Sequence, residues 1–196
     1  MKINRLGGGA FTIEDFLSGD ECSELIRHSE SLGYSEAAIQ TEDGQRLVKD
    51  ARNNDRVIFD DEPLAQKLYH RAQALLPAEL DGWAPSGFNQ RFRFYRYEKQ
   101  QQFTWHQDGT VRLGEDEESF LTFMVYLNEG FDGGSTDFGW ESIQPVTGMA
   151  LVFPHRLRHR GAVVNGGVKY ILRTDVLYAS KVPKAPGAPM LGGERE

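Results

Sequence analysis

The stretch FLTFMVYLNEGFDGG, residues 120–134, indicates the class of the fold. Its first half is rich in aromatic and branched side chains that favour strands, and its second half is a cluster of Asn, Asp and Gly that favours turns. Stretches of similar character follow along the chain, separated by Gly, Asn and Asp clusters. They are Arg91–Tyr97, Phe120–Leu127, Met149–Phe153 and Val168–Tyr178. Short strands alternating with turns predict a mainly β protein, either a sandwich or a barrel.

The residues before this β region predict helices. Ser18 followed by Glu21 is the pattern of a capping box. The apolar stripe behind it consists of Cys22, Leu25 and Ile26. A second helix is expected from about Asp61, with Pro63 in its first turn. Its inward-facing residues are expected to be Leu64, Leu68, Leu75 and Leu76. We therefore expect two or three N-terminal helices on the outside of a β-barrel, with the chemistry inside the barrel.

Length and composition are those of one globular domain. The chain has 196 residues, of which 39% are hydrophobic and 26% charged. Its net charge of -7 argues against general affinity for nucleic acid or for an anionic membrane. From residue 181 onward the sequence is rich in Pro and Gly. We expect a single domain over residues 1–180 and a flexible tail over residues 181–196.

The cysteine content and the absence of apolar segments indicate a cytoplasmic location. Cys22 is the only cysteine, so neither an internal disulfide nor a cysteine-based zinc site can form. The N-terminus has no apolar stretch of signal-peptide length, and no segment is apolar enough to cross a bilayer. The expected partner is a small molecule or a peptide. The sequence leaves the oligomeric state open.

His106-Gln107-Asp108 is the first candidate for a metal site. Residues two apart on a strand face the same side, with Cα atoms about 6.6 Å apart, so both side chains can reach one ion. A histidine and a carboxylate so placed are two parts of a 2-His-1-carboxylate triad, which leaves positions open on non-haem Fe(II). The pattern is common by chance when it stands alone. A second histidine is therefore needed.

Two of the remaining histidines are candidates for this third ligand. His28 and His70 lie on the expected surface helices, where they should be solvated, which leaves His155 and His159. Their spacing would suit a helical zinc site of the HExxH type, but Arg156 stands where that motif needs Glu. The strand-like neighbourhood and the preceding proline also argue against a helix there.

The order of motifs from residue 91 to residue 178 resembles that of a known family. The motifs are Tyr97-x-x-Gln-x-x-Phe103-x-x-His106-x-Asp108, Leu121–Asn128, Gly133–Thr136, Pro145-x-x-Gly148–Phe153 and His159-Arg160-Gly161 through Lys169-Tyr170. This series is similar to the prolyl 4-hydroxylase-like branch of the 2-oxoglutarate- and Fe(II)-dependent oxygenases. It covers a little under half of the chain. At Gln100 the family often has Gly, a departure that affects the expected geometry of the loop but not of the metal site.

The resemblance implies a fold, a reaction and a set of cofactors. The fold would be a double-stranded β-helix, a jelly-roll or cupin-like barrel, buttressed by the N-terminal helices. Fe(II) would be held by His106, Asp108 and His159, with no catalytic residue beyond these ligands. With O2 and 2-oxoglutarate, and ascorbate as reductant, such an enzyme hydroxylates a C–H bond and releases succinate and CO2.

The remote C5 carboxylate of 2-oxoglutarate needs a buried cation and hydroxyl donors. Tyr126 and Tyr97 stand at the family positions of phenols that serve this purpose, although packing alone would also explain tyrosines in strands. We expect the binding role for Tyr126 and leave both roles open for Tyr97. Lys169 lies ten residues after the distal histidine, as the basic residue of the family does. Arg173 is the competing cation, and it would touch substrate, cosubstrate or a nearby acid.

The turn at residues 165–167 bears on which face Lys169 occupies. A two-residue turn would pair His159 with Leu172 and turn the lysine away from the iron. A three-residue loop would pair His159 with Arg173 and place the lysine deeper on the same face. The binding role of Lys169 requires the second geometry.

The substrate is not readable from the sequence. It could be an amino acid, a peptidyl residue of the prolyl type or another small molecule. The segments 108–119 and 41–54 are expected to line the barrel mouth, and the acidic character of the first favours a polar or cationic substrate. A different class of function is a cupin-like barrel that binds metal without catalysis. Such a protein would not need the set formed by Tyr126, Lys169 and Arg173, so this set favours the oxygenase.

Overall fold

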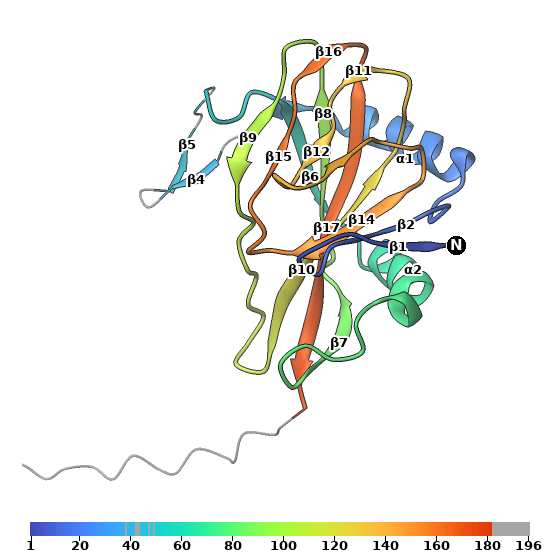
Figure 1. Cartoon of the computed structure of the whole chain (residues 1–196), viewed down its shortest axis with the longest axis vertical. Helices are drawn as coiled ribbons and strands as arrows, with labels where there is room; N and C mark the ends of the chain where they lie inside the picture. Colours follow the sequence, from blue (N-terminus) through green and yellow to red (C-terminus); the bar gives the residue numbers. More distant parts are fainter. Residues whose placement is uncertain (38, 42–43, 47, 49, 182–196) are drawn as a thin grey trace, which may run out of the picture.

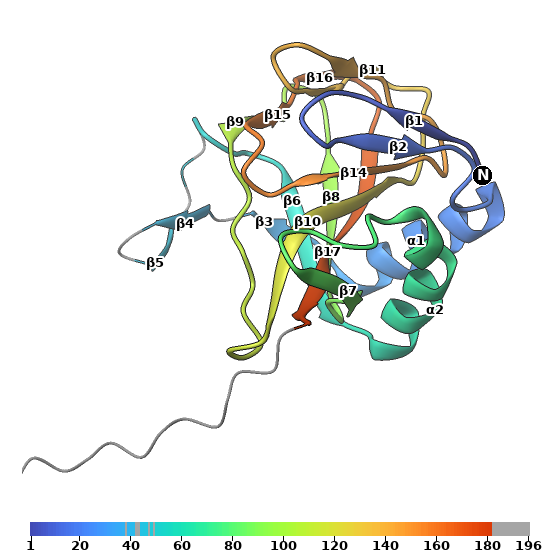
Figure 2. The ribbon, with the colours of Figure 1, turned by 60° about the horizontal axis from the view of Figure 1, so that its bottom comes forward.

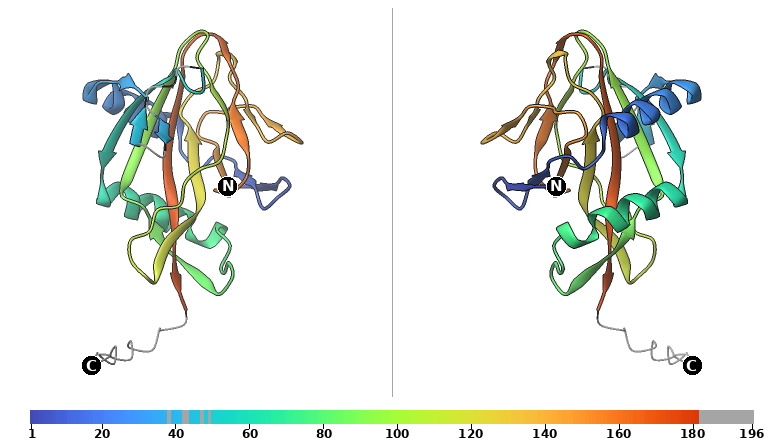
Figure 3. Two further views of the ribbon diagram at one scale, coloured as in Figure 1. Left: turned by 90° about the vertical axis from the view of Figure 1, so that its left-hand side faces the viewer. Right: turned by 90° about the vertical axis from the view of Figure 1, so that its right-hand side faces the viewer.

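The computed structural model describes residues 1–37, 39–41, 44–46, 48 and 50–181. The predicted flexible tail, from residue 182 onward, lies outside the described residues. One large sheet runs through the molecule, with helices on one side of it and shorter strands on the other (Figures 1 and 3). The predicted mainly β architecture with flanking helices is confirmed.

The large sheet has the strand order β1-β2-β14-β10-β17-β8-β6-β3, and β7 pairs with the far end of β17. These strands are β1 (Ile3–Arg5), β2 (Phe11–Ile13), β3 (Ser35–Glu36), β6 (Asp55–Asp60), β7 (Trp83–Phe88), β8 (Arg91–Tyr97), β10 (Glu117–Tyr126), β14 (Ala150–Pro154) and β17 (Lys169–Ser180). The four predicted stretches correspond to β8, β10, β14 and β17, with small differences at their ends.

A second sheet, of order β13-β12-β15-β9, covers part of the other face of the large sheet. It consists of β9 (Phe103–His106), β12 (Thr136–Asp137), β13 (Ser142–Ile143) and β15 (His159–Gly161). Two separate pairs remain, β11 (Asp132–Gly133) with β16 (Val164–Gly166) and β4 (Ile39–Thr41) with β5 (Gly44–Arg46). The β4–β5 pair projects from the body of the molecule beside β9 (Figures 1 and 2).

Both predicted helices form, and they cover the outer face of the large sheet (Figure 3). They are α1 (Gly19–Leu32) and α2 (Glu62–Ala72), the second followed by the 3-10 turn η1 (Gln73–Leu75). The Ser18 hydroxyl accepts from the backbone N–H of Glu21, whose carboxylate accepts from the N–H of Ser18, so the capping box is complete. Asp61 caps α2. Within the described part of the chain, neither helix is long and apolar enough to cross a membrane.

Alternation along β10 separates two cores. Leu121, Phe123 and Val125 pack toward the helices. Met124 and Tyr126 belong to the core between the two sheets, and Thr122 faces the same way. Because side chains alternate across a strand, one strand serves both the helical layer and the barrel interior. The barrel interior is where the candidate site lies.

Gln100, the departure from the family pattern, adopts a left-handed backbone conformation with φ +69°. This conformation costs a residue with a Cβ roughly 1–2 kcal/mol, whereas glycine adopts it freely. We expect Gln100→Gly to raise the free energy of unfolding by up to about 1 kcal/mol, after the extra entropy of glycine in the unfolded chain is subtracted. Thermal unfolding should show a melting temperature roughly 2–4 °C higher.

The matched control is Gln101→Gly, since Gln101 is not among the residues with positive φ. Its side-chain oxygen accepts from the N–H of Glu98, and glycine would lose that bond. This variant should melt below the wild type. A Gln100→Gly variant that also melts lower would mean that the glutamine side chain stabilises the loop more than its backbone strains it.

Candidate metal centre and adjoining pocket

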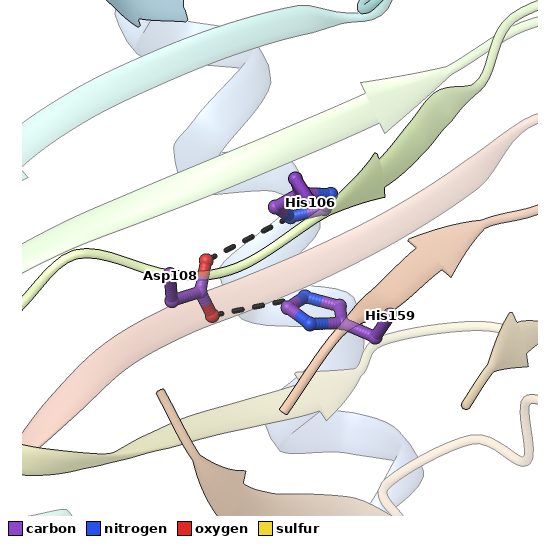
Figure 4. Close-up of side chains that lie close together, drawn as sticks. All are labelled: His106, Asp108 and His159. Atoms are coloured by element: carbon purple, nitrogen blue, oxygen red, sulfur yellow. Dashed lines mark ion pairs between the residues drawn. The ribbon is translucent and has the colours of Figure 1, made fainter. Parts of the chain in front are cut away.

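Two strands of the smaller sheet bring the two histidines together. His106 ends β9, His159 begins β15, and the two residues are directly paired across the strands. Asp108 completes the group, with carboxylate oxygens 3.7 Å from the Nε2 atoms of both rings. Figure 4 shows the carboxylate between the two imidazoles. The three candidate ligand atoms all lie within 4.8 Å of one another, close enough to share one ion.

The expected strand geometry for Asp108 is wrong, although its position is right. β9 ends at His106, so Asp108 lies beyond the strand. Its backbone N–H donates to the carbonyl of His155 at 2.9 Å, which holds the turn after the strand. The carboxylate therefore reaches the histidines through a fixed turn, not through the two-residue period of a strand.

Each imidazole is oriented by a backbone carbonyl. Nδ1 of His106 lies 2.7 Å from the carbonyl oxygen of Thr104, and Nδ1 of His159 lies 2.9 Å from that of Leu157. A carbonyl only accepts, so both Nδ1 atoms carry the proton and both neutral rings present a bare Nε2 to the centre. Burial lowers the pKa of His159 and, together with its neighbour, brings that of His106 to about 3. Two bare nitrogens facing a carboxylate form a donor set that suits a divalent cation.

Asp108 is held by two further groups. Arg173 Nη1 lies 3.0 Å from its Oδ1, and the Thr122 hydroxyl donates to its Oδ2. Burial alone would raise the pKa of this carboxyl, but Arg173 and the two histidines hold it below its ordinary value. Arg173 also contacts Asp175, at 3.2 Å, and its own Nε has no hydrogen-bond partner within the described ranges. The carboxylate is thus ionised and fixed in direction before any metal arrives.

His155 lies beside the cluster but not in it. Its Nδ1 is 2.9 Å from the Thr122 hydroxyl and its Nε2 is 2.8 Å from that of Ser119. Because Thr122 already donates to Asp108, it must accept from Nδ1–H, and Ser119 must then donate to Nε2. Ser119, His155, Thr122 and Asp108 form one directed chain. The roles of Thr122 and Ser119 could not be predicted, because nothing local in the sequence relates them to the candidate metal site.

A pocket adjoins the cluster and encloses about 400 Å³ of empty space, counted up to its open mouth. It lies between the two sheets. Its lining includes all three candidate ligands, and its other residues are Tyr95, Tyr97, Phe103, Thr122, Met124, Thr136, Phe153, Gly161, Lys169, Ile171 and Arg173. The lining residues that the sequence did not assign to the site are Tyr95, Phe103, Thr122, Met124, Thr136, Phe153, Gly161 and Ile171.

Lys169 is almost completely buried, with 1% of its surface exposed. Its Nζ donates to the carbonyl of Gly134 and lies 5.3 and 5.5 Å from the ring centroids of Tyr97 and Tyr126. Within the described part of the chain it has no ion-pair partner, and burial lowers its pKa to about 7. A buried cation without a carboxylate is costly, so a site of this kind suits an anionic ligand.

The two tyrosines differ in what their hydroxyls do. Tyr126 donates to the hydroxyl of Thr136 at 2.8 Å, and Thr136 in turn lines the pocket. The Tyr97 hydroxyl makes no hydrogen bond among the described residues, and Tyr97 lines the pocket itself. Burial raises the pKa of both phenols, that of Tyr97 to about 12, so both are neutral donors.

Neither expected hairpin exists. β15 pairs with β9 and β12, whereas β17 pairs with β7, β8 and β10, so the two strands belong to opposite sheets. The chain crosses between the sheets through β16, which pairs with β11. Lys169 and Arg173 nevertheless both face the pocket, because residues four apart on β17 share a face. The expected pairing of His159 across a hairpin is therefore wrong, whereas Lys169 does face the pocket as expected.

Comparisons with known proteins agree with this geometry. Residues 92–174 match the model of the 2OG-Fe(II) oxygenase superfamily. This part of the chain, a little under half of it, is therefore a 2-oxoglutarate- and Fe(II)-dependent oxygenase region. Its cofactors are therefore Fe(II), 2-oxoglutarate and O2, and its reaction is that of a hydroxylase. No curated protein matches the sequence.

The fold is of the prolyl 4-hydroxylase type, a double-stranded β-helix, as predicted. The chain is similar to the viral collagen prolyl hydroxylase of Paramecium Bursaria Chlorella virus-1, with 23% identity, a TM-score of 0.61 and coverage of 88% of this chain and 97% of that one. It is also similar to a Pseudomonas putida prolyl-4-hydroxylase, with 18% identity, a TM-score of 0.61 and coverage of 87% and 93%. A Trichoplax adhaerens prolyl hydroxylase, in complex with a hypoxia inducible factor peptide fragment, has 16% identity, a TM-score of 0.66 and coverage of 87% and 84%.

Proposed function

We propose that His106, Asp108 and His159 hold the Fe(II) of this oxygenase, within a single domain that extends to residue 180. The observation that carries this assignment is the convergence of two bare imidazole nitrogens on one ionised carboxylate. Three protein ligands would leave positions on the ion open for small molecules. When bound, the iron supplies the oxidising chemistry with O2 and 2-oxoglutarate.

We infer that Lys169 binds the C5 carboxylate of 2-oxoglutarate. Its burial, its place in the pocket and its lack of a carboxylate partner among the described residues all support this role. The Tyr97 hydroxyl, which has no hydrogen-bond partner among the described residues, is available to the same carboxylate, and Tyr126 donates to Thr136 beside it. Arg173 is already bound to Asp108 and Asp175, which favours the lysine as the main ligand of the C5 group. Arg173 then borders the pocket on the metal side, where it contacts the bound cosubstrate or substrate.

The proposed reaction is hydroxylation of a C–H bond of an amino-acid, peptidyl or small-molecule substrate, with release of succinate and CO2. The chain's own part is to hold the ligands in fixed tautomers, to keep Asp108 ionised and to exclude water from the cosubstrate. A metal-binding barrel without catalysis would not require a buried lysine at the end of a pocket, so that alternative is not favoured. Ascorbate is proposed as the reductant that restores Fe(II) after unproductive turnover.

Purified protein supplied with Fe(II), ascorbate and 2-oxoglutarate should release succinate slowly under air, even without a substrate. A chelator should abolish the release, because it removes the metal from an open site. Succinate can be measured directly, with anaerobic incubation as the control. If 2-oxoglutarate is neither bound nor consumed at any Fe(II) concentration, the barrel is not an active oxygenase.

A further inference from the structure

Arg52 lies next to the pocket and is 5% exposed. Its guanidinium is placed between two aromatic rings, 4.4 Å from the centroid of Tyr95 and 4.4 Å from that of Phe103. Both rings line the pocket, and the Phe103 ring stacks on His106 with centroids 3.5 Å apart. One aromatic ring therefore separates Arg52 from a metal ligand.

The hydrogen bonds of Arg52 leave part of the guanidinium unused. Nε donates to the side-chain oxygen of Asn54 at 2.7 Å, whereas Nη2 is buried and has no hydrogen-bond partner in the part of the chain that the structure describes. No carboxylate of the described residues forms an ion pair with it. A buried arginine of this kind is costly unless an acceptor completes it. The rings also fix the plane of the guanidinium, which prepares one edge for a planar, bidentate acceptor.

Arg56 adds a second unpaired cation on the same face. It lies on β6 directly opposite Tyr95 of β8, so its side chain faces the same side of the sheet as the pocket residues. Other arginines on this face form ion pairs with acidic residues: Arg91 pairs with Asp60, and Arg93 pairs with Asp175. Arg56 has no such pair within the described part of the chain. Burial lowers its pKa, and the nearby charges of Arg52, Arg93 and Arg173 lower it further. Positive charge beside the pocket therefore exceeds the negative charge available to balance it.

We propose that the substrate carries a carboxylate, and that Arg52, assisted by Arg56, binds this group beside the metal centre. The inference rests on the proposed function, and it names the substrate class that this function leaves open. It replaces the expectation of a cationic substrate. Two of the acids behind that expectation have other partners, since Glu118 pairs with Arg112 and Glu117 accepts from Ser86. Lys169 holds the cosubstrate at β17, so the two anions have separate cations.

The test compares acids with their neutral counterparts. The probes are a panel of N-acetyl amino acids and the matching N-acetyl amino acid amides, which differ only in the carboxylate. Binding to the full chain, loaded with Fe(II) and 2-oxoglutarate without oxygen, is measured by ligand-observed NMR. We expect at least one acid to bind, and its amide to bind about tenfold or more weakly, because a charge-assisted bond is lost. Equal binding of acid and amide, or no binding by any acid, would overturn the proposal.

Variants then test which arginine binds the carboxylate of the probe. Arg52→Gln should remove the preference for the acid, Arg52→Lys should restore part of it, and Arg56→Gln should reduce it. Arg91→Gln is the matched control, because that arginine is half-exposed and has its own acid. If Arg52→Gln unfolds, the acid and amide affinities of the wild type and of Arg56→Gln still test the proposal. An unchanged preference in both folded variants would show that neither arginine is the site.

A titration with 2-oxoglutarate separates this proposal from the one on which it rests. Arg52→Gln should bind the cosubstrate as the wild type does, because Lys169 is intact. If the wild type does not bind 2-oxoglutarate at all, the proposed function fails. The acid and amide panels, measured on the protein without cosubstrate, would then still show whether Arg52 binds carboxylates.

Discussion

The His159→Ala variant should lose its iron and, with it, all succinate release. Removing one of three protein ligands should lower iron affinity by more than about 100-fold. Loss of a group that only hydrogen-bonds to a ligand already lowers metal affinity by about 10–100-fold. His106→Ala and Asp108→Ala should behave in the same way. Metal content after anaerobic reconstitution and desalting measures the effect directly.

His155→Ala is the matched control, because it removes a buried histidine of the same strand-to-strand connection. Its ring reaches Asp108 only through Thr122, so the three candidate ligands remain. This variant should retain iron, with affinity reduced by at most about tenfold through looser orientation of the carboxylate. Loss of iron from His155→Ala and retention by His159→Ala would reverse the assignment.

The second large effect is expected at Lys169. Lys169→Met keeps most of the side-chain volume but removes the charge, so 2-oxoglutarate should bind about 10–100-fold more weakly while iron binding is spared. This range corresponds to a charge-assisted bond of roughly 1.5–3 kcal/mol. Anaerobic titration of Fe(II)-loaded protein with 2-oxoglutarate measures it. Arg173→Met is the comparison, and it should weaken substrate turnover more than cosubstrate binding. A large loss of cosubstrate affinity in Arg173→Met alone would identify Arg173 as the cation.

The lowered pKa of Lys169 predicts that folding stability and 2-oxoglutarate affinity both depend on pH. Burial lowers its folded pKa from 10.5 to about 7, so between these values the unfolded chain binds more protons than the folded one. Stability of the ligand-free protein should therefore rise with pH over this window through this group, and Lys169→Met should flatten that rise. The protonated lysine is the form that attracts a dianion, so 2-oxoglutarate affinity should fall as the pH rises above about 7. An affinity that rises above pH 7 would contradict the role of this cation.

Local patterns were sufficient for both helices and for four strands of the large sheet, but not for β1 to β6, which lie among residues expected to be helical. The capping box at Ser18 and the cap at Asp61 define helix starts through contacts three residues apart. The strands β8, β10, β14 and β17 follow from aromatic and branched composition, because such residues suit a pleated, buried surface. The two candidate metal-binding histidines could also be predicted, once the order of the motifs was considered together with residue type.

The sequence did not reveal which distant strands pair with one another. The turn at residues 165–167 is compatible with a hairpin, and nothing local reveals that the chain crosses to the opposite sheet there. The pairing of His106 with His159 depends instead on β9 and β15 lying side by side in a sheet that residues 107–158 connect. Turn chemistry specifies a local reversal, whereas sheet assignment depends on which apolar faces pack together.

The contacts of the arginines around the site could not be predicted for the same reason. Arg173 was expected to meet a cosubstrate or a nearby acid, and the acid is Asp108 itself. Arg52 belongs to a segment expected to line the barrel mouth, but its aromatic partners come from β8 and β9. A long charged side chain can reach several neighbours, and only the packed structure selects among them.

Anaerobic equilibrium binding of 2-oxoglutarate, with and without Fe(II), tests the central claim most directly. The account predicts one iron per wild-type chain and one 2-oxoglutarate that binds tightly only when the iron is present. His159→Ala should bind neither tightly, and His155→Ala should bind both. Cosubstrate binding that is independent of metal, or full iron binding by a variant lacking His106, Asp108 and His159, would contradict it.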